Sequence, residues 1–144
     1  MFSETTARDL RHRPLTDPTF AREAVDLLVS ERSRREGGLT LLACDDLGML
    51  KVPICADECP AEPDRTTRTA MGNLFWAVGG SLGPGATAVA VVGHQGSQVT
   101  DADRAWHELL VQVAADTDVR LLHFFVASPG YIHPMPPPLS LAAL

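Results

Sequence analysis

The sequence predicts an α/β fold in which one mixed β-sheet lies between two layers of helices. Short apolar runs bounded by turn residues alternate with longer segments whose apolar residues recur every three or four positions. A chain of 144 residues with 45% apolar side chains is long enough to bury a core without disulfides or a structural metal. We therefore expect one three-layer domain over residues 1–144, with the element order α-β-β-α-β-α-β-(β).

The two ends of the chain are predicted to lie outside the core. Residues 1–14 are polar and mixed in charge, which is typical of a flexible arm. Residues 134–144 begin with a proline-rich run and are expected to form a solvated tail, although polyproline of this kind also docks on partner proteins. The first helix is expected to begin at Thr16-Asp17-Pro18, to carry Arg32–Arg35 as its polar end, and to stop at Gly37-Gly38.

Two short apolar segments, Leu39–Cys44 and Leu50–Ile54, are separated only by the turn-forming residues 45–48, which predicts a β-hairpin. Pro53 cannot donate a hydrogen bond to a neighbouring strand, so the second strand is expected at an edge. An acidic, proline-containing loop over residues 57–64 follows the hairpin.

The second half of the chain predicts a parallel crossover. Asp64 is a suitable cap for a helix that ends before Gly83. Thr87–Val92 has no polar alternation, which is typical of a central strand covered on both faces. Thr100 and Asp103 predict a capping box for the next helix, and residues 121–127 form another apolar strand. A strand-helix-strand unit of this kind forms a right-handed parallel pair, with the hairpin beside it in the same sheet.

Charge and cysteine content restrict the class of protein. The net charge is −6, and eleven of the twelve basic residues are arginine, a bias typical of GC-rich, actinobacterial-type genomes. No basic stripe is present, so we expect no nucleic-acid partner. No signal peptide or run of about 20 apolar residues is present, so we expect no membrane span and a cytoplasmic protein. Three cysteines, Cys44, Cys55 and Cys59, are an odd number and indicate reduced thiols; Cys55 and Cys59 lack a second ligand pair for zinc.

The candidate binding site is the loop between the central strand and the capped helix. Its polar residues are not needed to hold the fold, and α/β sheets place ligands at this edge. The candidate residues are His94, Gln95, Ser97 and Asp103. The acidic 57–64 loop is the nearest candidate rim.

Two alternatives use the same loop. His94, Asp103 and His107 are residue types that bind zinc, and Asp103 and His107 are four apart on one helical face. The simpler interpretation leaves Asp103 as a cap and His107 in solvent. Residues 93–97 also resemble a phosphate loop, but Asp101 and Asp103 place negative charge where phosphate would bind.

Several features of the chain together resemble the RadC-like branch of the JAB (JAMM/MPN) metalloprotease fold. They are the element order, the strand pair at residues 39–54, the apolar strand at 88–92, the capping Thr100, the string at 121–126 and the turn Gly130-Tyr131. The resemblance covers about residues 35–133. It implies a zinc bound by His-x-His and by an aspartate about ten residues later, with a catalytic glutamate on the earlier hairpin.

Only one part of that motif has a clear counterpart here. Asp103 matches the aspartate, whereas Gly93-His94-Gln95 stands where the two histidines belong, and Glu58 lies near the position of the glutamate. The resemblance therefore implies a JAB-like domain that has lost its metal site. We expect a non-catalytic binding or accessory protein with no cofactor, an unidentified protein or small-molecule partner, and a possible homo-oligomeric state. The alternatives are a zinc-dependent peptide or isopeptide hydrolase that uses His94, Asp103 and His107, and a small nucleotide-binding module.

Overall fold

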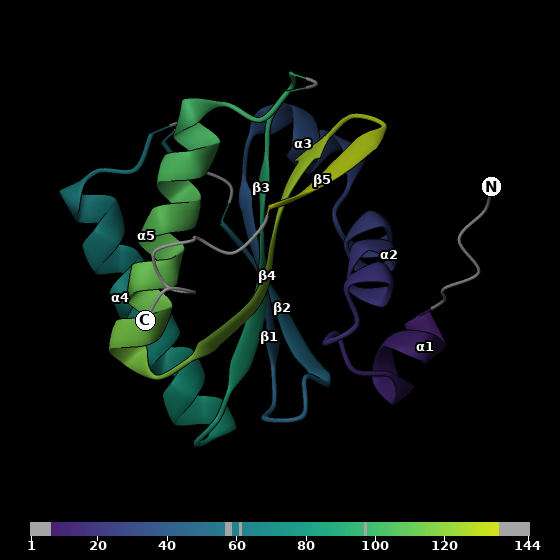
Figure 1. Ribbon diagram of the computed structural model, residues 1–144, viewed down its shortest axis with the longest axis vertical. Helices are drawn as coiled ribbons and strands as arrows, with labels where there is room; N and C mark the ends of the chain where they lie inside the picture. Colours follow the sequence, from purple (N-terminus) through teal and green to yellow (C-terminus); the bar gives the residue numbers. More distant parts are fainter. Residues whose placement is uncertain (1–6, 57–58, 61, 97, 136–144) are drawn as a thin grey trace.

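The computed structural model describes residues 7–56, 59–60, 62–96 and 98–135, which form a three-layer arrangement of one mixed sheet between two groups of helices (Figure 1). This is the predicted fold class. The helices are α1 (Ala7–His12), α2 (Pro18–Leu28), α3 (Glu31–Glu36), α4 (Arg65–Leu82) and α5 (Asp101–Thr117). The strands are β1 (Leu39–Cys44), β2 (Leu50–Ala56), β3 (Thr87–Gly93), β4 (Arg120–Ser128) and β5 (Tyr131–Met135).

The sheet has the order β2-β1-β3-β4-β5, so β3 is its central strand. β3 and β4 are parallel neighbours, and every other adjacent pair is antiparallel. The predicted hairpin, the central apolar strand and the parallel crossover are confirmed. Pro53 lies on β2, an edge strand, where a missing N–H removes no necessary hydrogen bond.

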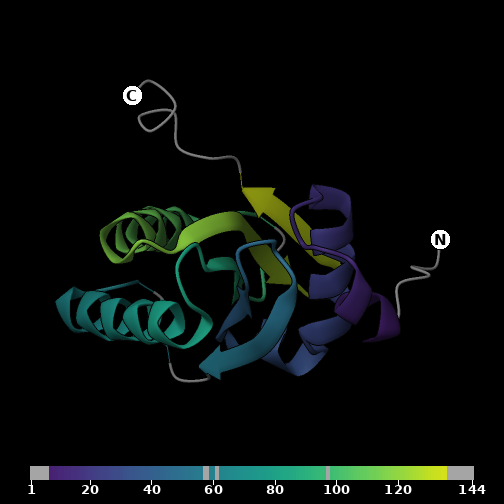
Figure 2. The ribbon, with the colours of Figure 1, turned by 90° about the horizontal axis from the view of Figure 1, so that it is seen from below.

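Each face of the sheet has its own core. α4 and α5 lie side by side on one face, and α1 and α2 cover the other (Figure 2). Successive residues of β3 point to opposite faces, so Ala88 and Ala90 pack toward α4 and α5 while Val89 and Val91 pack toward α2. Because both faces of β3 are buried, its sequence contains no polar alternation.

Polar side chains cap the starts of three helices at the positions that the sequence predicts. Asp17 and Asp64 accept backbone N–H groups at the starts of α2 and α4. At α5, the Asp103 N–H donates to Thr100 Oγ1 (3.2 Å) and the Thr100 N–H donates to Asp103 Oδ2 (2.8 Å), so the predicted capping box is confirmed.

The N-terminal region is more ordered than its composition indicates. The prediction of a loose arm up to residue 14 is wrong for residues 7–14, because α1 buries Leu10 and the following Leu15 is fully buried. The single helix expected over residues 16–36 is also wrong. Ser30 accepts the Ser33 N–H and starts a separate helix, α3, whose end is the left-handed Gly37.

The last strand extends into the predicted tail. β5 continues through Pro134 to Met135, whereas Pro134 was expected to end regular structure. β5 is an edge strand, and proline, which has no N–H to donate, is tolerated at a sheet edge. Residues 1–6 of the expected arm and 136–144 of the expected tail lie outside the described residues. Among the described helices, none has the length and apolar character needed to cross a bilayer.

Candidate functional site

A cavity of about 500 Å³ lies at the carboxyl end of the central strand β3. The loop after β3 and the first turns of α5 form one wall, which is the position predicted for a binding cleft. The 36–39 segment and the start of the loop before α4 form the other. The lining side chains used below are Glu36, Cys59, His94, Gln95, Asp103 and Trp106.

Close backbone packing fixes the loop after β3. The Gly93 N–H donates to the Gly38 carbonyl (2.9 Å), and the His94 N–H donates to the Ala127 carbonyl (3.1 Å). A Cβ atom on Gly93 would lie 2.7 Å from the carbonyl oxygen of Ser33. Only glycine therefore allows α3 to pack against the end of β3, and this contact closes one wall of the cavity.

His94 and Asp103 meet inside the cavity, as the sequence predicts for two residues of one site. His94 Nε2 lies 3.0 Å from Asp103 Oδ2, and the two side chains are 19% and 7% exposed. The ring nitrogen is buried, and its direction does not make this contact a hydrogen bond, so Nε2 has no hydrogen-bond partner among the described residues. The Asp103 side chain therefore makes two contacts: it completes the helix cap, and it lies beside an imidazole nitrogen that has no hydrogen-bond partner.

The other candidate loop residues differ in their surroundings. Gln95 lines the cavity, and its side-chain amide donates to the Arg35 carbonyl (3.1 Å), which ties the loop to the end of α3. Ser97 and Glu58 lie outside the described residues.

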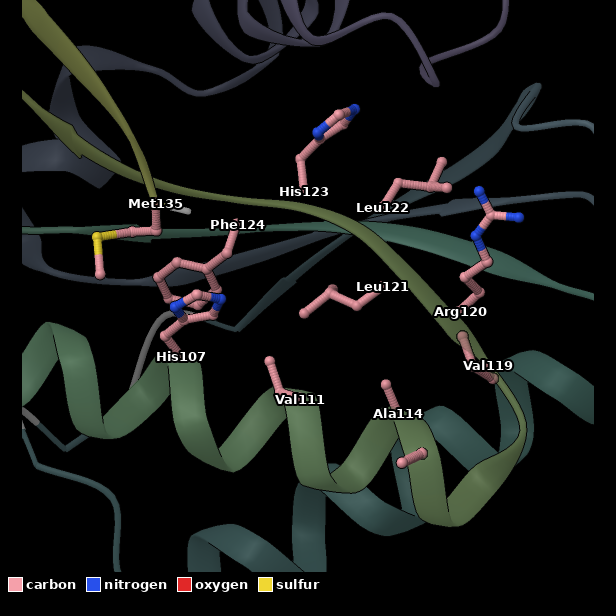
Figure 3. Close-up of a pocket in the computed structure, with 11 residues that line it drawn as sticks. His107, Val111, Ala114, Val119, Arg120, Leu121, Leu122, His123, Phe124 and Met135 are labelled. Atoms are coloured by element: carbon pink, nitrogen blue, oxygen red, sulfur yellow. The ribbon is translucent and has the colours of Figure 1, made fainter. Parts of the chain in front are cut away.

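His107 does not join His94 and Asp103. It was expected in solvent, but it is only 7% exposed, and its ring stacks on Phe124 with 4.7 Å between the ring centroids. It lines a separate cavity between α5 and β4 (Figure 3). Burial lowers the pKa of His107, which favours the neutral ring. The reason for the error is that α5 packs on β4 as well as on α4, so a wider face of the helix is buried than one apolar stripe indicates.

Metal-binding residue types are therefore dispersed. Within the described ranges, no three His, Cys, Asp or Glu side chains are grouped so as to hold a metal ion. Cys59 lines the same cavity as His94 and Asp103, and its thiol donates to the Ala56 carbonyl (3.6 Å). Cys55 is exposed and does not line this cavity.

The charge of the cavity disfavours anions. Its lining contains two carboxylates, Glu36 and Asp103, and neither lysine nor arginine among the described residues. Glu36 is paired with Arg32 (3.0 Å), while Asp103 receives only the cap N–H and the His94 contact in the described structure. The first turn of α5 also carries Asp101. A phosphate group would meet negative charge here without a compensating cation.

The sequence predicted some of the walls and missed others. Pro60 forms part of the rim, in the loop expected there, and the Trp106 indole N–H donates to its carbonyl (3.2 Å). Trp106 belongs to the buried face of α5, and it also closes the cavity. The Gly37-Gly38 segment was predicted only as a helix stop. Its two glycines, which have no side chains, also allow the backbone of β3 to pack closely against this segment.

No family model matches the chain, and neither a curated protein nor a solved structure shows significant similarity to it.

Proposed function

We propose that the chain is a non-catalytic binding protein that takes a small neutral or cationic molecule into the cavity at the end of β3. The observation that carries this proposal is the His94–Asp103 pair: a buried ring nitrogen without a hydrogen-bond partner beside a carboxylate, inside a preformed cavity. Buried polar atoms are rarely left unsatisfied, so a ligand that bonds to this nitrogen or to the carboxylate would be stabilised.

The class of ligand follows from the lining. A carboxylate accepts hydrogen bonds, and the Trp106 and Leu39 side chains supply apolar surface. An amine or hydroxyl group attached to a small apolar body matches both features. The absence of a basic side chain from the described lining argues against the nucleotide alternative.

A matched set of probes tests the ligand class. We expect benzylamine and benzyl alcohol at millimolar concentration to shift the NMR signals of the Trp106 indole N–H and of His94, and benzoate to leave them unchanged. His94→Ala should abolish the shifts, whereas Gln98→Ala, at an exposed position outside the lining, should retain them. A preference for benzoate, or no shift with any probe, would contradict the proposal.

The runner-up is a zinc-dependent peptide or isopeptide hydrolase, and the 3.0 Å approach of His94 to Asp103 is the observation that favours it. The position of His107 on the α5–β4 side argues against the third ligand this reading needs. We expect protein purified without a His tag to contain far less than one zinc per chain. Near-equimolar zinc that is lost on His94→Ala would overturn the non-catalytic proposal.

A further inference from the structure

The cavity between α5 and β4 is separate from the proposed ligand site and has a volume of about 330 Å³. Val111 on α5 and Leu121 on β4 point toward each other across its middle, and Phe124 and Met135 lie at one end (Figure 3). Val111, Leu121 and Met135 are each partly exposed, so apolar surface here remains in contact with solvent in the described structure. An apolar protein cavity of about 150 Å³ holds benzene, so a cavity of this size accommodates a molecule with two fused rings.

One polar side chain enters this cavity. His107 is only 7% exposed, and its ring stacks on Phe124. Figure 3 shows a ring nitrogen of His107 directed along the space between Val111 and Leu121. The described residues supply no hydrogen-bond partner to this ring. Because a buried polar atom without a partner costs free energy, a ligand that bonds to it here would be stabilised.

The other polar residues at this cavity face elsewhere. Arg120 and His123 border it, but both side chains lie on the opposite side of β4 from α5 (Figure 3). His123 Nε2 lies 2.9 Å from the Leu15 carbonyl oxygen, which holds the ring on that side. The described lining contains no carboxylate. A charged ligand of either sign would therefore lose its hydration without meeting an opposite charge inside the cavity.

A hydroxyl group matches the chemistry of His107. Burial lowers the pKa of His107, which favours the neutral ring. In a neutral imidazole one nitrogen donates a hydrogen bond and the other accepts one. A hydroxyl group both donates and accepts, so it can bond to whichever nitrogen faces the cavity.

We propose that the cavity between α5 and β4 is a second binding site, which takes a neutral aromatic alcohol whose hydroxyl group bonds to His107 and whose rings lie between Val111 and Leu121. The site is independent of the cavity at the end of β3, because it shares neither His94 nor Asp103 with that cavity.

NMR titration of the full chain with three matched probes tests the ligand class. We expect 2-naphthol to bind about fivefold more tightly than naphthalene, as one additional hydrogen bond predicts, and 2-naphthoate not to bind. His107→Phe keeps a ring against Phe124 but has no hydrogen-bonding nitrogen, so it should bind 2-naphthol and naphthalene equally. Binding of 2-naphthoate, or the same preference for 2-naphthol in parent and variant, would overturn the proposal.

Filling the cavity provides a second test. Val111→Phe should weaken the binding of 2-naphthol by about tenfold or more, because the new ring occupies the space between α5 and β4. Gln112→Phe, the same change at the next and exposed position outside the lining, should leave the Kd within about twofold. Circular dichroism checks that both variants are folded. Unchanged binding in Val111→Phe would overturn the proposal.

The position of the shifted signals separates the two cavities. Binding of 2-naphthol should shift the signals of His107 and Leu121. If the signals of His94 shifted in their place, the alcohol would be bound in the cavity at the end of β3. That result would overturn the second site and leave the proposed function standing.

Discussion

Among the four residues 32–35, only Arg34 has a buried side chain. It is 2% exposed, whereas Arg32 and Arg35 lie at the surface. Its guanidinium donates to Asp26 Oδ1 (3.0 Å) and to Glu31 Oε1 (3.3 Å), so it joins α2 to α3. The sequence indicated only the polar end of a helix for this run, because charge alone does not distinguish which arginine lies beneath the others.

Arg34→Ala should lower the free energy of unfolding by about 1–2 kcal/mol, because buried alkyl packing and charge-assisted hydrogen bonds are lost. The cost stays moderate since both carboxylate partners are more than half exposed and return to water. Urea unfolding measures the effect, and Arg35→Ala, at an exposed position, should remain within about 0.5 kcal/mol of the parent. Equal losses of stability in the two variants would show that the ion pairs of the buried Arg34 do not contribute to the free energy of unfolding.

His107 makes stability depend on pH. Burial lowers its pKa from the ordinary value of 6.5, so in acid the unfolded chain takes up a proton that the folded chain resists. The stability contributed by the neutral ring is present above pH 6.5 and is lost as the pH falls from 6.5 through the lower pKa of the folded state.

His107→Phe should retain an aromatic ring against Phe124 and remove this titration. Urea unfolding at pH 7.5 and at pH 5.5 should therefore give a smaller acid-induced loss of stability in the variant than in the parent. The same loss in both proteins would mean that His107 takes no part in the pH dependence.

The packing of α3 on the end of β3 decides the shape of the candidate site. Gly93 has the backbone of α3 against it, with Arg34 Cα 2.9 Å from the position a Cβ would occupy. Gly72, in the middle of α4, has no atom within 4 Å of the same position. The two glycines therefore have opposite structural roles.

Gly93→Ala should cost about 1–3 kcal/mol, since α3 must move away from the sheet. Gly72→Ala should stabilise the protein by up to about 1 kcal/mol, because alanine has the higher helix propensity and meets no obstacle. Thermal unfolding of the two variants provides the comparison. A neutral Gly93→Ala would show that α3 is not held against β3.

One sheet joins the two cores of the protein. Both faces of β3 are buried, and each core contains a fully enclosed phenylalanine, Phe20 on the α2 side and Phe75 on the α4 side. Trp76 and Trp106 both belong to the α4 and α5 layer. Tryptophan fluorescence therefore reports one face, whereas far-UV circular dichroism reports the whole fold.

Phe20→Leu and Phe75→Leu should each lower stability by about 1–3 kcal/mol and shift the fluorescence and circular dichroism midpoints together. The physical reason is that the strands cannot lose one face and keep the other, because each strand contributes residues to both cores. Separate midpoints in Phe20→Leu would indicate that the α1 and α2 layer unfolds independently.

Local sequence determined the elements whose apolar pattern and caps agree. These elements were predicted because periodicity, turn residues and caps act over a few positions. They are the hairpin, the apolar central strand, the capped starts of α2, α4 and α5, and the parallel β3–β4 pair. Local sequence missed α1, which contributes the buried residue Leu10, and the break at Ser30, where a capping side chain interrupts a helical pattern.

The sequence also placed the candidate site at the carboxyl end of the central strand and named His94 and Asp103 within it. Only the tertiary structure decided which side chains meet there. His107 is four residues from Asp103, yet it packs on Phe124 because α5 contacts β4 as well as α4. Contacts between residues distant in the chain bring further residues to the wall of the cavity, namely Trp106, Pro60 and the 36–39 segment. Patterns along the chain specify which face of an element is apolar, whereas the packing of elements on one another specifies which polar groups share a space.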